Sequence, residues 1–159
     1  MKNLLFVFTI CCLAVACEKE SASELLPIDS RSSYVIQVSG EISEQGLNSN
    51  LGPNGLSYTG VDTWTGDLTG DGHAHIYSSE GSDPENQQNI ISKKWLHTSE
   101  GNLIFDEVGS QNGNVVTVIS TVSKGTGIYK NATGQLTMNG ILVDGGVQFT
   151  YNGSLTLVD

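Results

Sequence analysis

Apolar and polar residues alternate along most of the chain from Ser33 onward, in short runs separated by turn-forming residues. Residues 34–42 (YVIQVSGEI), 114–123 (NVVTVISTVS) and 147–157 (VQFTYNGSLTL) show the pattern most clearly. Since successive side chains of a strand point to opposite faces, a period of two is typical of a half-buried β-strand. The pattern predicts about eight strands and no helix over residues 33–159.

The composition argues against helices in the same region. The 19 glycines are scattered through the chain, and each one inside a helix would cost up to about 1 kcal/mol relative to alanine. Val, Thr and Ile dominate the apolar runs, as a pleated, half-buried surface favours. One tight hairpin is expected at Asn112-Gly113, since both residues tolerate the positive φ of a type I′ turn. Sequential strands joined by hairpins indicate an up-and-down barrel or a sandwich, and closure into a barrel would remove unpaired strand edges.

A glycine-rich stretch at residues 124–140 (KGTGIYKNATGQLTMNG) points to one of these architectures. Its defining positions are Gly125, Thr126, Gly127, Tyr129, Ala132, Thr133, Gly134 and Gly140. This spacing resembles the glycine-rich hairpin of the allene oxide cyclase barrel superfamily, which also includes the dirigent proteins. The resemblance implies an all-β fold, an eight-stranded antiparallel up-and-down (calycin-like) barrel whose apolar lumen opens at one end. It carries no catalytic residue over to this chain.

The first residues predict where the protein is sent. Lys2 precedes an apolar run that is too short to span a bilayer comfortably and that ends in small residues before Cys17. This pattern resembles a bacterial lipoprotein signal, in which the cysteine becomes the first residue of the mature chain and carries the lipid. An ordinary cleaved secretory signal is the alternative.

The chain is therefore expected to divide into three parts. These are a lipoprotein signal peptide over residues 1–16, the lipidated Cys17 with a flexible tether over residues 17–32, and the β-barrel domain over residues 33–159. Acyl chains such as palmitate on Cys17 would hold the protein on a membrane without a spanning helix. The expected location is the cell envelope, as an outer-membrane lipoprotein of a Gram-negative bacterium, with the leaflet left open.

The formal net charge of −10 at pH 7 limits the partners. Such a surface repels phosphate backbones, so nucleic acid is not an expected partner. Cys11 and Cys12 lie in the expected signal, which leaves Cys17 without a partner for an internal disulfide. The sequence indicates no cofactor and leaves the oligomeric state open.

Residues 66–75 (GDLTGDGHAH) look more like a site than any other stretch. A calcium loop starting at Asp67 would need a bidentate glutamate at its twelfth position, where Ser78 stands, and flanking helices. An Asp-Gly turn between two strands explains the same residues with fewer requirements. We therefore predict a hairpin here.

Two histidines in this stretch are the candidates for a metal site. His73 and His75 share one face of the predicted strand, while Ala74 and Ile76 take the other. A catalytic zinc site usually takes three protein ligands, so His97 or a nearby aspartate would have to lie close by. We favour the interpretation in which Ala74 and Ile76 face inward, the histidines face solvent, and no metal is bound.

The aromatic residues on predicted strands are the candidates for lining a ligand-binding lumen. They are Trp64, Trp95, Phe105, Phe149 and Tyr151. Such residues usually fill a core, and an eight-stranded barrel is at the size where the interior is either filled or just admits one small ligand. The sequence therefore leaves open whether the lumen is open or filled.

Glu107 is the candidate acid catalyst, and its role depends on which face of its strand is buried. If Leu103 and Phe105 face inward, Glu107 is a carboxyl group in the lumen. If Ile104 and Val108 face inward instead, Glu107 is solvated, which is the commoner arrangement.

Three functions remain open from the sequence. The first is a membrane-anchored, non-enzymatic barrel that binds a small, mostly apolar ligand or a partner. The second is a cyclase or isomerase that holds a reactive substrate in the lumen, which needs few chemical groups. The third is a structural envelope lipoprotein with a filled core. A polar residue such as Glu107 in an open lumen would favour the second, and a lumen plugged by Trp and Phe the third.

Overall fold

The structure is a computed structural model that describes residues 32–50, 57–80 and 86–158. All of these residues belong to one compact unit that runs from Arg31 to Asp159. The expected signal peptide and Cys17 lie outside the described residues, as does the expected tether apart from Ser32. In the described part of the chain, no helix is long and apolar enough to cross a membrane.

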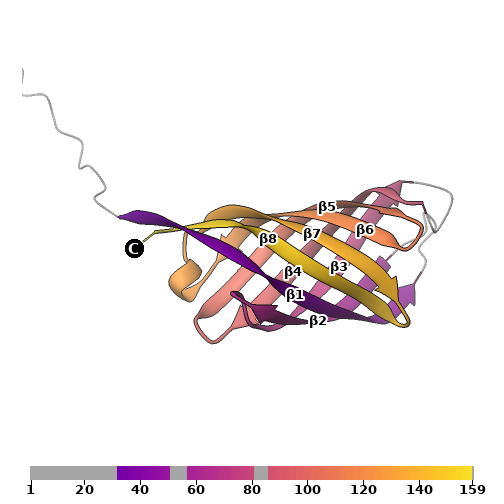
Figure 1. Ribbon diagram of the computed structural model, residues 1–159, viewed down its shortest axis with the longest axis horizontal. Coiled ribbons are helices and arrows are strands. Elements are labelled where there is room, and N and C mark those ends of the chain that lie inside the picture. Colours follow the sequence, from indigo (N-terminus) through magenta and orange to yellow (C-terminus); the bar gives the residue numbers. More distant parts are fainter. Residues whose placement is uncertain (1–31, 51–56, 81–85, 159) are drawn as a thin grey trace, which may run out of the picture. The chain divides into compact units, whose positions relative to one another are not determined.

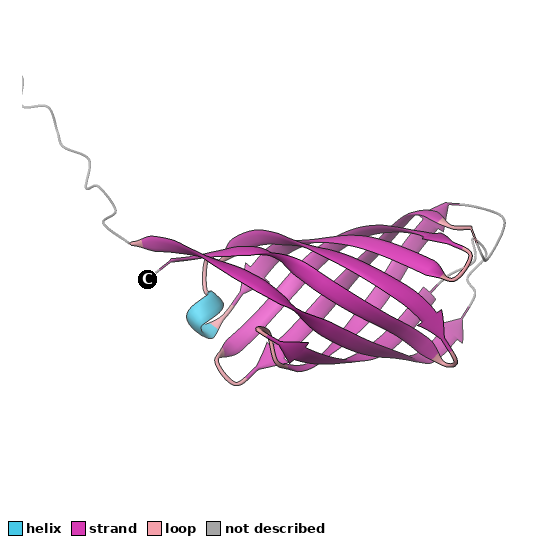
Figure 2. Cartoon of the chain, viewed as in Figure 1, coloured by secondary structure: helices cyan, strands magenta, loops and turns pink. Residues whose placement is uncertain are grey.

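Eight antiparallel strands form a closed barrel in which each strand pairs with its neighbours in the sequence (Figure 1). The strands are β1 (Ser33–Asn50), β2 (Ser57–Gly66), β3 (Gly70–Glu80), β4 (Gln88–Thr98), β5 (Gly101–Asn112), β6 (Val115–Gly125), β7 (Thr133–Val143) and β8 (Gly146–Val158). A single 3-10 turn, η1 (Gly127–Tyr129), connects β6 to β7 (Figure 2). The predicted fold class, an up-and-down barrel of eight antiparallel strands, is confirmed.

The barrel closes between its first and last strands. The register of β1 and β8 runs from Ser33 opposite Val158 to Gln45 opposite Gly146. Every strand therefore has two hydrogen-bonded neighbours, and closure removes the exposed edges of an open sheet.

The connection between β6 and β7 shows why the glycine-rich stretch needs its glycines. A Cβ at Gly125 would collide with the carbonyl oxygen of Tyr129. Gly127 has a φ of 61°, and a Cβ there would collide with the carbonyl oxygen of Glu100. Glycine alone combines this backbone conformation with so close an approach. Local packing thus accounts for both glycines.

The tight turn between β5 and β6 lies one residue later than predicted. Asn112 is still in β5, where it pairs with Val115, and the two turn residues are Gly113 and Asn114. Gly113 has a φ of 59°, whereas neither asparagine is in the left-handed region. The expected type I′ turn centred on Asn112-Gly113 is therefore wrong, because only the first central residue has a positive φ.

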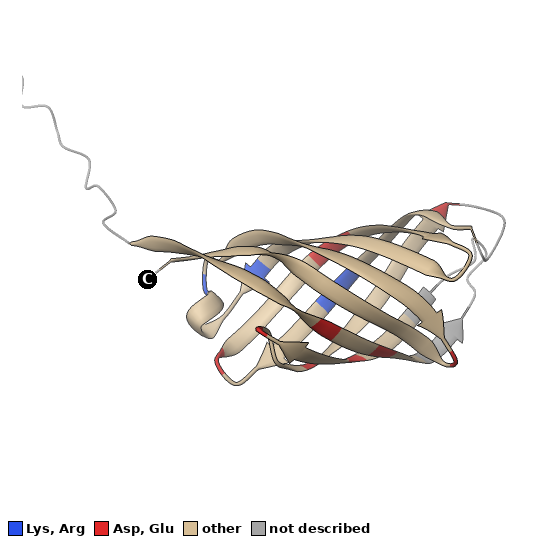
Figure 3. Cartoon of the chain, viewed as in Figure 1, with Lys and Arg blue, Asp and Glu red and all other residues tan. Residues whose placement is uncertain are grey.

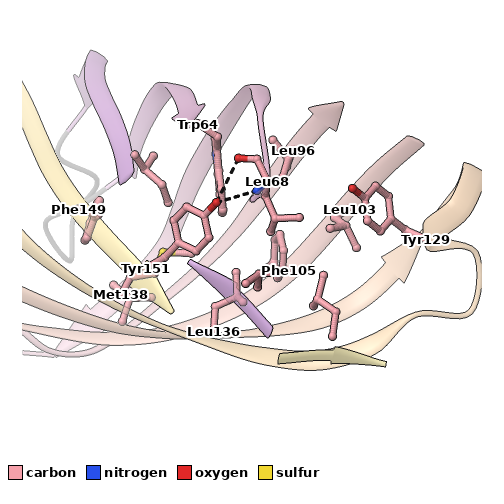
Figure 4. Close-up of a cluster of buried hydrophobic side chains, with 14 of the residues drawn as sticks. Trp64, Leu68, Leu96, Leu103, Phe105, Tyr129, Leu136, Met138, Phe149 and Tyr151 are labelled. Atoms are coloured by element: carbon pink, nitrogen blue, oxygen red, sulfur yellow. Dashed lines mark hydrogen bonds between the residues drawn. The ribbon is translucent and has the colours of Figure 1, made fainter. Parts of the chain in front are cut away.

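The two ends of the barrel differ in what fills them. The connections after β2, β4 and β6 lie at one end, and the turns at residues 113–114 and 144–145 lie at the other. At the first end large apolar side chains fill the lumen (Figure 4). We call this end the plugged end, its side chains the plug, and the opposite end the mouth. The plug consists of Val38, Ile42, Trp64, Leu68, Leu96, Leu103, Phe105, Tyr129, Leu136, Met138, Tyr151, Leu155 and Leu157.

Aromatic packing and one hydrogen-bonded tyrosine organise the plug. The rings of Trp64 and Phe105 stack with centroids 5.9 Å apart, and Tyr151 lies 5.1 Å from Trp64. The Leu68 backbone N–H donates to the Tyr151 hydroxyl at 2.9 Å, which draws the turn after β2 over the end of the barrel. Full burial of one such large side chain stabilises a fold by roughly 1.5–3 kcal/mol. The barrel thus has its own core and closes on its own strands, so we expect residues 31–159 to fold by themselves.

Candidate functional site

Residues 66–75 form a turn at residues 67–69 followed by the start of β3, so the predicted hairpin is present but the predicted Asp-Gly turn is wrong. Asp71 and Gly72 already lie in β3, where they pair with Thr63 and Asp62 of β2. The Asp67 carboxylate accepts hydrogen bonds from the Ser39 backbone amide at 2.7 Å and from the Ser39 hydroxyl at 3.1 Å. This carboxylate therefore ties the turn to β1. Ala74 is buried inside the barrel, and His73 and His75 lie on the outer face, again as predicted.

The outer histidines belong to a cluster of rings on β3 and β4. The His73 ring stacks on Trp95 with centroids 4.6 Å apart and lies 5.8 Å from the His97 ring. Partial burial and the neighbouring His97 lower the pKa of His73, which favours the uncharged form of its ring. Across the residues that the structure describes, no group of three or more His, Cys, Asp or Glu side chains is arranged to hold a metal ion. Stacking of the His73 ring on Trp95 and His97 explains why these rings lie together.

The structure corrects one candidate for the lumen. Trp95 lies on the outer face of β4, because the residues on either side of it, Lys94 and Leu96, point into the barrel. The expectation that Trp95 lines the lumen is therefore wrong. A tryptophan stacked on His73 covers the outer surface, and a lysine takes the inward position.

The other four aromatic candidates point into the barrel, but only one of them borders free space. Trp64, Phe105 and Tyr151 belong to the plug (Figure 4). Phe149 lies nearer the mouth and lines a cavity. Of the predicted lumen aromatics, Phe149 alone can contact a ligand there.

A cavity of about 330 Å³ occupies the mouth half of the lumen. Its apolar lining comes from Ala74, Ile76, Ile90, Val116, Val118, Leu142, Val143, Val147 and Phe149, and its polar lining from Glu44, Ser92, Lys94, Glu107 and Gln111. Small side chains leave the space open, since Ala74, Gly145 and Gly146 are among the lining residues. Sites for small molecules typically have this form, with apolar walls and a few polar groups that fix orientation.

Lys94 lies at the inner end of this cavity and is only 2% exposed. Its Nζ lies 2.6 Å from Glu44 Oε2 and 3.3 Å from Asp62 Oδ2, and 5.2 Å from the centre of the Phe149 ring. Figure 3 shows the strands that supply these charges, with blue on β4 and red on β1 part-way along the barrel. The contact with Asp62 is electrostatic, because neither Asp62 oxygen meets a donor at hydrogen-bond geometry in the described part of the chain.

Glu107 points into the lumen and is almost fully buried. Its Oε2 accepts a hydrogen bond from the Ser92 hydroxyl at 2.8 Å, and its Oε1 accepts one from the Ser120 hydroxyl at 2.7 Å. Leu103 and Phe105 face inward with it, so the structure selects the rarer of the two arrangements that the sequence left open. The serines satisfy a carboxylate that would otherwise be costly to bury.

Burial and the neighbouring charges both change the pKa values of Asp62 and Lys94. Burial and the neighbouring Glu44 raise the pKa of Asp62 to about 7, although the Lys94 ammonium counteracts this. For Lys94, burial lowers the pKa, but Glu44, Glu107 and Asp62 together outweigh that effect and raise it above its usual value. Lys94 is therefore charged at neutral pH, while Asp62 is protonated in a large fraction of the molecules.

This arrangement can position a polar group and can exchange a proton. Glu44, Lys94 and Glu107 present an ammonium and two carboxyl groups to the cavity, in surroundings where hydrogen bonds are stronger than in water. Asp62 does not line the cavity and acts through Lys94 and Glu44. A carboxyl group with a pKa of about 7 gains and loses a proton within the physiological range.

The sequence reading missed Glu44, Asp62 and Lys94. Their positions in the strands could have revealed them, since each lies two residues from an apolar residue that faces the core and therefore points to the same side of the strand. Glu44 is two residues from Ile42, Asp62 two from Trp64, and Lys94 two from Leu96. A charged residue at a position where the alternation of the strand predicts an inward-facing apolar residue thus indicates a polar group in the lumen.

Neither a scan against protein-family models nor a search of curated proteins gives a match to this chain. The function is therefore inferred from the residues of the lumen.

Proposed function

We propose that this protein binds a small, mostly apolar ligand in the mouth half of its barrel, while lipid chains on Cys17 hold it at the bacterial cell envelope. The observation that carries the ligand-binding proposal is the cavity of about 330 Å³ with apolar walls and polar groups at its inner end. A core built only for stability would be expected to fill this space, since voids of this size cost stability.

Filling the cavity tests this proposal. Val118 lines the cavity, and Val108, on the outer face of the neighbouring strand, is 52% exposed. Native mass spectrometry of the protein purified from bacterial cells should show an added small organic mass. Val118→Phe should remove that mass, and Val108→Phe, the same change on the outer surface, should leave it. A bare mass for the unmodified protein, unchanged after exposure to lipids and terpenoids, would contradict ligand binding.

The position of Glu107 supports a second candidate function, a cyclase or isomerase that shapes a reactive substrate in the lumen. Its carboxylate lines the cavity and is held by two serine hydroxyls, so it is fixed in place beside a bound molecule. Turnover separates the two candidates. An isomerase would release a product of unchanged mass and altered chromatographic retention, and Glu107→Gln would slow this conversion by at least about 100-fold. A binding protein would release the ligand unaltered.

A further inference from the structure

The cavity has a mostly apolar outer part, in which Gln111 is the polar lining residue, and a polar inner end. Ile90, Val143 and Gly145 lie near the mouth, next to the turns that close β5–β6 and β7–β8. Lys94 lies four residues further along β4 than Ile90 and is followed on the same face by Leu96 of the plug. A molecule that fills the cavity therefore places one end against charged groups and the rest against hydrocarbon.

The charges at the inner end are mostly negative. Among the described residues, the acidic side chains of Glu44 and Glu107 outnumber the one cation at this end, Lys94, and the partly protonated Asp62 adds to the negative charge. The Lys94 ammonium already contacts two of them, at 2.6 Å and 3.3 Å. A further anion would enter a poorly solvated site whose one positive charge is already neutralised, which is unfavourable.

The same groups still accept hydrogen bonds. A carboxylate offers about four lone-pair positions on its two oxygens, and the serine hydroxyls occupy one position on each oxygen of Glu107. A donor at the inner end of a ligand therefore finds a charged acceptor, and hydrogen bonds to charged groups are the stronger ones.

The volume limits the size of the molecule. An engineered protein cavity of about 150 Å³ takes up benzene, and the present cavity, at about 330 Å³, has roughly twice that volume. A ligand with about ten to twelve carbon atoms fills such a space.

We propose that the lumen selects an amphipathic molecule of about ten to twelve carbons whose inner end donates a hydrogen bond, as an alcohol or an ammonium does, and that it discriminates against carboxylate-ended lipids of the same length. This specificity rests on the proposed ligand-binding function. Glu107 is the specificity-determining residue, and Lys94 with Glu44 and Asp62 sets the negative charge around it.

The test compares three ten-carbon probes, 1-decanol, decylamine and decanoate, by isothermal titration calorimetry at pH 7 with residues 31–159. We expect 1-decanol and decylamine to bind at least tenfold more tightly than decanoate. Val118→Phe should abolish the binding of all three, which separates lumen binding from adsorption of decylamine to the acidic surface. Glu107→Gln should strengthen decanoate binding and so narrow the gap between 1-decanol and decanoate.

The outcomes distinguish the specificity from the function on which it rests. Decanoate binding as tight as 1-decanol binding, and lost in Val118→Phe, would overturn the specificity and leave ligand binding intact. No binding of any probe would overturn both. The ranking of the probes on the unmodified protein decides the matter even if Glu107→Gln does not fold.

Discussion

At the scale of single residues, Lys94 matters most, because it is a buried cation shared by acidic side chains from β1 and β2. Removing its charge leaves Glu44 and Asp62 buried next to each other without a counter-ion. Breaking a buried ion pair in this way typically costs about 3–5 kcal/mol, whereas removing an exposed pair costs about 0–1 kcal/mol.

The adjacent lysine provides a matched control. Lys93 lies on the outer face of β4 and pairs with Asp106 at 2.7 Å, where the Lys93 side chain is partly exposed and the Asp106 side chain is exposed to solvent. We expect Lys94→Met to lower the free energy of unfolding by about 3–5 kcal/mol and Lys93→Met by less than about 1 kcal/mol, measured by urea unfolding at pH 7. Equal effects of the two substitutions would mean that the buried ion pairs of Lys94 contribute no more to the free energy of unfolding than the exposed pair of Lys93 does.

Asp62 makes the stability depend on pH. Its pKa is raised from 3.8 to about 7 in the folded protein, where Glu44 and Lys94 are the charged groups beside it. Between these values the folded protein retains a proton that the unfolded chain has lost, so stability falls as the pH rises from about 4 to about 7 and this contribution is constant above. Three pKa units correspond to at most about 4 kcal/mol.

Asp62→Asn should remove this dependence, because an amide does not titrate. The difference in unfolding free energy between the native protein and Asp62→Asn, followed by urea unfolding from pH 4 to pH 8, should shift in favour of the variant as the pH rises. Carboxyl groups that do not interact with Asp62 are present in both proteins and cancel in the difference, so the difference reports on Asp62 together with its neighbour Glu44. Parallel curves over this range would show that Asp62 is already ionised at pH 4 in the folded state.

The candidate site could be predicted from the sequence only in part, for reasons that also lie at this scale. Phe149 and Glu107 were found because aromatic and acidic residues stand out on a strand. Lys94 was missed because the neighbouring Trp95 is larger and more apolar, and hydrophobicity alone places the tryptophan inside. The inward position of Leu96 outweighs this preference, because Lys94 points to the same side of the strand as Leu96. The acidic side chains that pair with the buried lysine lie on strands far away in the sequence.

At the scale of elements, the connection between β6 and β7 combines two constraints that can be separated. Gly127 and Gly113 have nearly the same φ, 61° and 59°, so alanine is strained by the backbone at both positions. A Cβ at Gly127 would collide with the Glu100 carbonyl oxygen, whereas a Cβ at Gly113 would meet nothing within 4 Å. Of these two glycines, only Gly127 is therefore packed closely against another connection at the plugged end.

Alanine at the two positions should separate the two costs. We expect Gly113→Ala to lower the unfolding free energy by about 1–2 kcal/mol through backbone strain alone. Gly127→Ala should cost at least about 1 kcal/mol more, since the turn has to move away from Glu100. Thermal unfolding monitored by circular dichroism measures both, and equal costs would rule out a contribution from packing at Gly127.

Strands were easier to predict than turns. Period-two alternation identifies strands because one face of each is buried, and the barrel retains this pattern along most of its length. The turn after β5 was misplaced by one residue, because Asn-Gly and Gly-Asn both suit a tight turn and the pairing of Asn112 with Val115 decides between them. That pairing is set by the register of two whole strands.

At the scale of the whole molecule, the sequence indicates a closed barrel but not how much of its interior is empty. The number of strands fixes the width of the lumen, and the plug and the cavity then depend on which side chains meet across it. Leu68 fills the plugged end from a turn, which strand periodicity does not predict. Ala74 and the glycines near residue 145 leave the mouth half open.

Membrane attachment is tested at this scale as well. If acyl chains on Cys17 anchor the protein, the native chain should partition into the detergent phase of a Triton X-114 extract, and Cys17→Ser should move it to the aqueous phase. The barrel should remain folded in both proteins, as measured by circular dichroism. Aqueous partitioning of the native chain would contradict lipidation and favour an ordinary secretory signal.

The pairing of β1 with β8 has a consequence for the order in which the strands follow one another. Ser33 lies opposite Val158, on strands that are about 5 Å apart, so the eight strands form a ring whose starting point is arbitrary. A short linker from Val158 to Ser33 and new termini at residues 113–114 should give a circular permutant with the same barrel and cavity. In such a permutant the chain would begin and end at the mouth, so a reporter group fused there would sit at the entrance to the cavity.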